Sequence, residues 1–298
     1  MKNTNLKGAV TALITPFINQ VLDEEGLVYN INHQIVNRIN GILVLGTTGE
    51  ASTLSLEEKA RVINITVKQA KGKVPVWVGT GLYCTRQTIE STKRAKDLGA
   101  DVALIVTPYY SKPTQEGIFR HFEAIAEKVD IPIVVYNIPG RCGTNIETPT
   151  LKRIAGLPNI IGVKEASGNI SQAEDVLRTV VSQYPNFLVY SGDDALTLPM
   201  MSLGAIGVIS VVSNLVPAQV TELVNAASKG RFDLAKEIHY QLLPLFKAAF
   251  IETNPVPIKT AMGLCGMPSG DCRLPLYKME TKNLDILHQS LVQMKLIS

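Results

Sequence analysis

The chain has 298 residues, of which 46% are hydrophobic and 18% are charged, and its formal net charge is +3. This composition is typical of a globular protein with a large core, and the mild charge excess argues against a nucleic-acid-binding or membrane-surface protein. No apolar run reaches the roughly 18 residues of a membrane span, and the first residues, MKNTNLKGAVTALITPF, lack the features of a signal peptide. We therefore expect a cytoplasmic protein with neither nucleic acid nor membrane among its partners.

Eight short apolar runs recur along the chain, about 20 to 35 residues apart, which is the length of one strand plus one crossover helix. In chain order they are GAVTALITPF (8–17), GILVLGTTGE (41–50), VPVWVGTG (74–81), DVALIVTPYY (101–110), IPIVVYNIP (131–139), IIGVKEAS (160–167), FLVYSGDD (187–194) and AIGVISVVSN (205–214). The runs lack polar alternation, as expected of parallel strands that are buried on both faces. Eight such units predict a closed (β/α)8 TIM barrel, and the missing GxGxxG turn disfavours a dinucleotide-binding sheet.

Amphipathic helical segments separate these runs. One of them begins with a capping box, formed by Ser55 and Glu58. Asn169 and Gln172 give a weaker form of the same signal directly after the sixth run. Both pairs predict the start of a helix that follows a strand.

The last part of the chain differs in character from the rest. From about residue 216 onward only helical segments follow, broken at NPVPIK (254–259) and again around a Met-Pro pair. These segments cannot belong to the eightfold strand–helix repeat. We therefore expect a catalytic barrel over residues 1–225 and a small C-terminal helical appendage over residues 226–298.

The carboxyl ends of the predicted strands are unusually polar, and in a (β/α)8 barrel the active site lies at these ends. The polar groups are Gly46–Glu50 after the second strand, Thr107–Tyr110 after the fourth, Tyr136, Asn137 and the loop residue Arg141 after the fifth, Lys164 at the end of the sixth, and Ser191–Asp194 after the seventh. Together they predict a ring of hydroxyls, one amine and one guanidinium around a single mouth.

Lys164 stands at the end of an otherwise apolar strand. If it points into the barrel, strand alternation places Gly162 and Ala166 inside with it and turns Val163 and Glu165 toward the helices. An ammonium group in such a place loses hydration, so its pKa falls, and the neutral amine can attack a ketone to form a Schiff base. The alternative is a lysine paired with an acid or extended out of the barrel. The hydroxyls predicted at the same mouth favour the reactive amine.

Other residues at the mouth suggest carboxylate binding and proton transfer. Thr47 and Thr48 lie in a glycine-flanked turn whose backbone N–H groups could hold a small carboxylate. Tyr136 and Tyr110 are phenols that could relay protons through a threonine hydroxyl, although Tyr110 alone would more often be a packing residue. Arg141 suits bidentate recognition of a carboxylate, although a loop arginine is more often only solvated.

Metal binding is not predicted. The four cysteines and four histidines show neither CxxC nor HExxH spacing, so we expect free thiols in a reducing compartment. Asp193 and Asp194 could resemble a metal-binding pair, but no third ligand accompanies them. Helix capping is the favoured interpretation of these two residues.

Seven motifs occur together in one order: GTTGE, TPYYSKPTQEG, YNIPGR, GVKEASG, SGDD, GVISV and NPVPIK. In these motifs, and over nearly its whole length, the chain resembles the dihydrodipicolinate synthase family of pyruvate-dependent class I aldolases, which is related to N-acetylneuraminate lyase. The resemblance implies a lyase that condenses pyruvate with aspartate 4-semialdehyde through a Schiff base. It also implies that no metal or organic cofactor is needed and that the protein is a homotetramer, built as a dimer of dimers.

The resemblance implies a role for each candidate catalytic residue. Lys164 matches the Schiff-base lysine, and Tyr136 matches the proton donor or acceptor for the bound keto acid. Thr47, Tyr110 and Tyr136 match a hydroxyl proton relay, in which Tyr110 comes from the neighbouring subunit.

The same resemblance assigns the substrate-binding residues. Thr48 and the main chain of Ile209 match the contacts to pyruvate, Gly192 lines the pocket, and Arg141 matches the residue that binds the second substrate's carboxylate. The Thr-Thr pair and Arg141 favour a synthase over N-acetylneuraminate lyase or a 2-keto-3-deoxy sugar acid aldolase or dehydratase, which remain alternatives. A non-catalytic keto-acid-binding barrel is less favoured, because the lysine, threonine and tyrosine set is intact.

Overall fold

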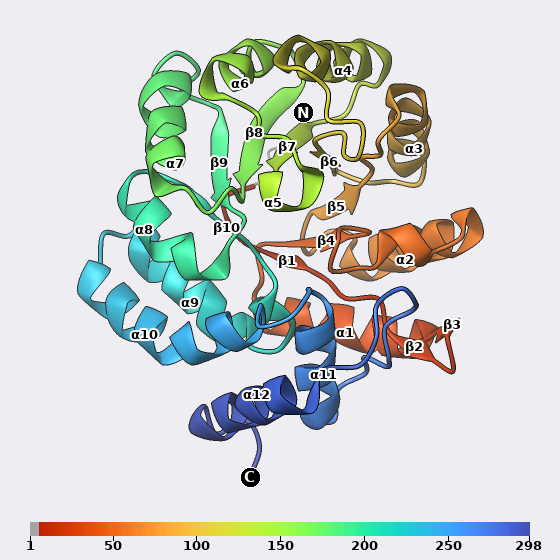
Figure 1. Cartoon of the computed structure of the whole chain (residues 1–298), viewed down its shortest axis with the longest axis vertical. Coiled ribbons are helices and arrows are strands. Elements are labelled where there is room, and N and C mark those ends of the chain that lie inside the picture. Colours follow the sequence, from red (N-terminus) through yellow and green to blue (C-terminus); the bar gives the residue numbers. More distant parts are fainter. Residues whose placement is uncertain (1–5) are drawn as a thin grey trace.

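The computed structural model describes residues 6–298, and eight parallel strands in it close into a barrel (Figure 1). In chain order the strands are β1 (Gly8–Ala12), β4 (Gly41–Val44), β5 (Val76–Gly79), β6 (Val102–Val106), β7 (Ile133–Asn137), β8 (Ile160–Glu165), β9 (Leu188–Ser191) and β10 (Gly207–Ser210). Each lies within one of the eight predicted runs, and β1 pairs with both β4 and β10 to complete the ring. The predicted (β/α)8 barrel is confirmed.

Helices surround this ring (Figure 1), and all but the last of them lie between successive barrel strands. They are α1 (Glu24–Val36), α2 (Leu56–Ala70), α3 (Thr85–Asp97), α4 (Gln115–Lys128), the short α5 (Pro139–Cys142), α6 (Thr148–Ala155), α7 (Ile170–Val176), α8 (Thr197–Ser202) and α9 (Pro217–Ser228). The predicted capping box is present, because the Ser55 side chain accepts from Glu58 N and the Glu58 side chain accepts from Ser55 N. Asn169 also caps its helix, but the Gln172 side chain bonds elsewhere.

Two further strands were not predicted. They are β2 (Phe17–Ile18) and β3 (Val21–Leu22), which form an antiparallel hairpin outside the barrel. Each has only two residues, too few to show a periodic pattern in the sequence.

The C-terminal part consists of α10 (Phe232–Ala248), α11 (Val256–Leu264) and α12 (Thr281–Gln293). Figure 1 shows α11 and α12 beside α1 and α10, at one flank of the barrel. The predicted break at NPVPIK is present, since α10 ends before it and α11 begins inside it. Residue 225, the predicted domain boundary, lies within α9, and the division remains a prediction. None of the helices within residues 6–298 has the length and apolar character needed to cross a bilayer.

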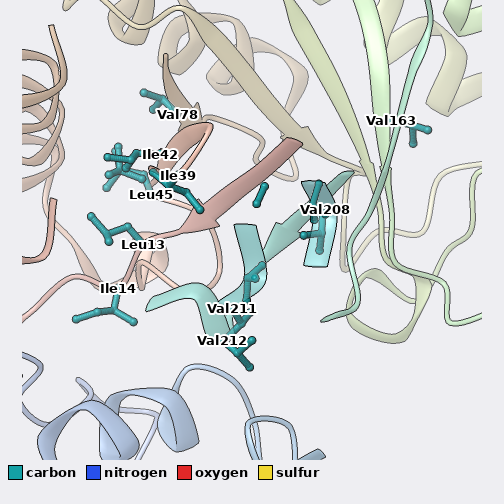
Figure 2. Packing of buried hydrophobic residues seen from close by; sticks show 14 of the residues in the cluster. Leu13, Ile14, Ile39, Ile42, Leu45, Val78, Val163, Val208, Val211 and Val212 are labelled. Carbon is teal, nitrogen blue, oxygen red and sulfur yellow. The ribbon is translucent and has the colours of Figure 1, made fainter. Parts of the chain in front are cut away.

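Hydrophobic side chains pack on both sides of the barrel wall. Figure 2 shows part of the outer layer, between strands and helices, which includes Val163 and Val208. The inner layer fills the barrel and contains Trp77 and Tyr190, whose ring centroids lie 5.4 Å apart in an edge-to-face arrangement. Ala166 packs against this inner layer, so the predicted alternation along β8 is confirmed. Because large side chains fill the barrel interior, space for a ligand lies at the carboxyl ends of the strands.

A buried ion pair joins the C-terminal part to the barrel. Lys259 Nζ donates to Glu50 Oε1 at 2.7 Å, and the two side chains are 2% and 1% exposed. The same ammonium donates to the carbonyl oxygen of Thr15, and the other Glu50 oxygen accepts from the backbone N–H of Arg273. Glu50 ends the turn after β4, so its bonds with Lys259 and Arg273 hold α11 and the segment after it against the barrel mouth.

Removing one partner of this pair leaves a buried charge without compensation. We expect Lys259→Met to lower the free energy of unfolding by about 3–5 kcal/mol, measured by chemical denaturation. The matched control is Lys278→Met, whose 3.8 Å pair with Asp271 is exposed and whose loss should cost at most about 1 kcal/mol. Equal effects of the two substitutions would contradict the structural role of the buried pair.

Candidate active site

Lys164 is buried at the carboxyl end of β8. Its side chain is 5% exposed, and its Nζ lies 4.4 Å from the centroid of the Tyr136 ring. Burial lowers the pKa of Lys164 from its usual 10.5 to about 8. A lysine with this pKa carries a substantial fraction of neutral, nucleophilic amine near neutral pH.

Two charged groups act on this amine in opposite directions. After burial, the largest influence on the pKa of Lys164 is the Asp194 carboxylate, which raises it, and the Arg141 guanidinium lowers it. Within residues 6–298 no carboxylate forms an ion pair with Lys164, whereas the equally buried Lys259 is paired with Glu50. The alternative of an acid-paired structural lysine therefore applies to Lys259 and not to Lys164.

Gly192 follows β9 and lies against the lysine side chain. A Cβ atom at this position would come within 2.5 Å of Ala166 Cβ and 3.0 Å of Lys164 Cε. Any larger residue would push the lysine aside, so the absence of a side chain sets the path of Lys164. Gly192 therefore lies directly beside Lys164, and its role in lining a substrate pocket remains a prediction.

Tyr136 is the neighbour of Lys164 on the adjacent strand. The two residues are paired in the register between β7 and β8, and Tyr136 is 7% exposed. Burial raises the pKa of the phenol, while Arg141 and a hydrogen bond with the Thr47 side chain lower it. The phenol is therefore protonated at neutral pH and can donate a proton at the site. Lys164, Tyr136 and Thr47 are thus brought together as predicted.

The turn after β4 carries Thr47 and Thr48. It is closed by backbone hydrogen bonds from Gly49 N to Gly46 O and from Glu50 N to Thr47 O. The Thr48 hydroxyl is buried and accepts a 2.9 Å hydrogen bond from Asn254 Nδ2. A residue of the C-terminal part therefore reaches the barrel mouth.

Asn254 was not among the predicted site residues. Its carbonyl oxygen accepts from Arg141 Nη2 at 3.2 Å, so it touches both Thr48 and Arg141. The motif NPVPIK was recognised in the sequence, but a residue more than 200 positions from Thr48 gives no local signal of this contact. Arg141 itself is exposed on α5, where its charge faces the mouth and acts on Lys164 and Tyr136.

The two aspartates after β9 have different surroundings. Asp193 caps the turn that follows, because its side chain accepts from Ala195 N, as predicted. Asp194 does not cap the turn that follows it: it is 1% exposed and accepts from the Ser210 hydroxyl and from the N–H groups of Val211 and Val212, at the start of the short 3-10 helix after β10. These bonds hold the end of β10, where Ile209 lies in the barrel interior. Within residues 6–298 no group of three histidine, cysteine or acidic side chains could hold a metal ion.

Tyr110 is the one predicted catalytic residue that stands apart from the others. Its side chain is 92% exposed, and within residues 6–298 it has no hydrogen-bond partner. Its φ of +72° lies in the left-handed region, which a tyrosine rarely adopts. A single chain therefore brings together Lys164, Tyr136 and Thr47, but not Tyr110.

Comparisons of the sequence and of the structure with known proteins point to one family. The sequence model of the Dihydrodipicolinate synthetase family matches residues 5–294. A 4-hydroxy-tetrahydrodipicolinate synthase from Protochlamydia amoebophila is 57% identical over 287 residues, which are 96% of each chain. The crystal structure of dihydrodipicolinate synthase from Thermotoga maritima superposes with a TM-score of 0.96 at 41% identity, over 98% of this chain and 99% of that one. A monomeric dihydrodipicolinate synthase variant superposes with a TM-score of 0.96 at 41% identity, over 98% and 97% of the two chains. The chain belongs to the dihydrodipicolinate synthetase family.

Proposed function

We propose that this chain is a 4-hydroxy-tetrahydrodipicolinate synthase, which condenses pyruvate with L-aspartate 4-semialdehyde in the diaminopimelate and lysine pathway. The observation that carries the proposal is the unpaired, buried Lys164, whose amine has a pKa lowered to about 8 beside the Tyr136 ring. The activity named for the relatives supports the same reaction.

Pyruvate binds first and reacts with the lysine. Thr48 and the end of β10 at Ile209 hold its carboxylate, and its keto group lies beside the Lys164 amine. The neutral Lys164 amine attacks the keto carbon, and loss of water gives a protonated imine. The imine nitrogen then draws electrons from the methyl carbon, so that no metal or organic cofactor is required.

Proton transfers at this stage fall to the hydroxyl groups. Tyr136 supplies a proton to the departing water, because its raised pKa keeps the phenol protonated. A methyl proton of the imine then leaves, and the enamine forms. Thr47 connects Tyr136 to the outside of the pocket, and Tyr110 of a second copy completes the relay.

The exposure of Tyr110 supports an assembly of more than one chain. A phenol that is 92% exposed and has no hydrogen-bond partner in the described part of its own chain is available to the site of a neighbour. We infer a homotetramer built as a dimer of dimers, whereas one structural neighbour is a monomeric variant.

The second substrate enters past Arg141. The guanidinium binds the carboxylate of the semialdehyde, and the enamine carbon attacks its aldehyde carbon to form the new carbon–carbon bond. The amino group of the same substrate then attacks the imine carbon. This ring closure displaces Lys164 and returns the free amine.

Borohydride tests the lysine assignment. Reduction in the presence of pyruvate should fix a reduced pyruvyl group on Lys164, because this residue alone of the two buried lysines in residues 6–298 lacks an ion pair. Peptide mass spectrometry should find the group there and not on Lys259, and Lys164→Ala should remain unlabelled. Labelling of Lys259, or unchanged labelling of Lys164→Ala, would contradict the assignment.

Arg141 tests the choice of second substrate. A lost charge-assisted contact costs about 1.5–3 kcal/mol, so Arg141→Ala should lower kcat/KM for the semialdehyde by about 10- to 150-fold. Arg141→Lys keeps the charge but loses the bidentate fork, so it should still form the pyruvate imine as readily as the wild type while using the semialdehyde poorly. Full use of the semialdehyde by Arg141→Ala would show that another group binds its carboxylate.

An assay of the wild-type protein distinguishes the rival reactions. If it cleaves N-acetylneuraminate or a 2-keto-3-deoxy sugar acid and ignores the semialdehyde, the synthase proposal is wrong. If it forms an imine but turns over no aldehyde, the barrel only binds keto acids.

A further inference from the structure

A buried polar network lies on the outer side of the barrel wall, directly behind the catalytic pair. Tyr136 and Lys164 are partners in the register between β7 and β8, and the next residues along, Asn137 and Glu165, are partners as well. Successive strand residues point to opposite faces, so Asn137 and Glu165 face the helices while Tyr136 and Lys164 face the pocket. The side chains of Asn137 and Glu165 are 1% and 3% exposed.

Glu165 is a buried carboxylate held by amide donors. Its Oε1 accepts from Ser167 N at 2.7 Å, and its Oε2 accepts from Asn137 Nδ2 at 3.0 Å and from Gln172 Nε2 at 3.1 Å. Within residues 6–298 no lysine, arginine or histidine forms an ion pair with it. A buried charge without a counterion is costly, and an apolar side chain would fill the same space without that cost. Directional hydrogen bonds are what this carboxylate provides and an apolar residue lacks.

Asn137 connects the network to the loop that follows Arg141. Its Oδ1 accepts from Ile146 N at 3.0 Å, and its Nδ2 donates to Asn145 Oδ1 at 2.8 Å. Asn145 Nδ2 in turn donates to Gln172 Oε1 at 2.8 Å. The ends of β7 and β8, the start of α7 and the loop after α5 are therefore fastened at one point.

Backbone hydrogen bonds carry this arrangement to the pocket. Ala166 N donates to Asn137 O at 2.9 Å, and Gly192 N donates to Glu165 O at 2.7 Å. Gly192 also lies against the Lys164 side chain. A shift of Glu165 or Asn137 would thus move the lysine, its glycine neighbour and the tyrosine together.

We propose that Glu165 and Asn137 are positioning residues, which fix Lys164 against Tyr136 and hold the Arg141 loop in register with them. The proposal rests on the catalytic roles proposed above. A small misplacement of reacting groups can cost up to about a hundredfold in rate, so a rigid support behind the pair has a kinetic benefit. A purely structural role would change stability alone.

Swapping the carboxylate and the amide between positions 165 and 137 tests this directly. In Glu165→Gln the new amide leaves either Ser167 N or the donors of Asn137 and Gln172 without an acceptor. In Asn137→Asp two carboxylates meet in a buried space. The double variant reverses the pair, so that the amide introduced on β8 donates to the carboxylate introduced on β7. The side-chain amides of Asn145 and Gln172 can turn over to complete the bonds, which restores the net charge and every hydrogen bond of the network except the 3.3 Å one from Gln172 Nε2 to Ile146 O.

The readout is exchange of the pyruvate methyl protons with deuterium from the solvent. This exchange needs Lys164 and Tyr136 but not the semialdehyde, so it isolates the pair. Each single variant should lose roughly 10- to 100-fold in exchange rate while borohydride still labels Lys164, and the double variant should recover most of the loss. Wild-type exchange in both single variants, or no recovery in the double variant, would overturn the proposal.

Two further variants separate positioning from general stability. Asp101→Asn weakens a comparable hydrogen bond, from Val76 N at 2.9 Å, at the amino end of β5, and should lower the melting temperature without affecting exchange. Gln172→Leu removes the link between Glu165 and the Arg141 loop. Because Gln172 is half-exposed at the start of α7, this variant is the substitute if Glu165→Gln or Asn137→Asp fails to fold. It should lower kcat/KM for the semialdehyde roughly tenfold and slow exchange less than Glu165→Gln does, because Ser167 N and Asn137 Nδ2 still hold the carboxylate. Unchanged kinetics of Gln172→Leu would overturn the proposal. Absence of exchange in the wild type would instead refute the proposed function.

Discussion

Loss of hydration around one ammonium group is the constraint on which the site depends. Moving the pKa of Lys164 from 10.5 to about 8 corresponds to about 3 kcal/mol of destabilised charge. The fold must supply this energy through the packing of the barrel, because no carboxylate within residues 6–298 pairs with the amine. Other features follow from the same need. Gly192 leaves room for the side chain, the aromatic and aliphatic interior keeps water away, and Asp194 stands close enough to limit the shift without forming an ion pair.

The chain contains two buried lysines with opposite roles. The Lys259 ammonium donates hydrogen bonds to Glu50 and to the carbonyl oxygens of Thr15 and Asp271. Its charge is therefore compensated, and its role is structural. Lys164 lies against the face of Tyr136, in the more distant field of Asp194. Burial alone therefore does not make a lysine reactive; burial without a partner does. The two are also linked, because Lys259 secures the segment from which Asn254 reaches Thr48 and Arg141.

The strands and the position of Lys164 could be predicted because both depend on local pattern. Eight apolar runs predicted the barrel, and strand alternation placed Lys164 inside and Glu165 outside. The contacts of Asn254 with Thr48, of Asp194 with Ser210 and of Glu165 with Gln172 could not be predicted in this way, since each joins side chains from different elements. Two adjacent aspartates illustrate the limit: Asp193 caps a turn, whereas Asp194 is buried against β10, and no sequence pattern separates them. The residue roles, the homotetramer and the boundary at residue 225 remain predictions.

The most direct test of this account is the titration of the Lys164 amine itself. The initial rate of imine formation with excess pyruvate should be measured from about pH 6 to 11, with loss of the keto absorbance or borohydride trapping as the signal. Only the neutral amine attacks, so a pKa lowered by burial predicts a rate that rises with pH, has its midpoint near 8 and is level above it. A midpoint near the usual 10.5 of an exposed lysine would show that burial does not activate this amine, and would contradict the account.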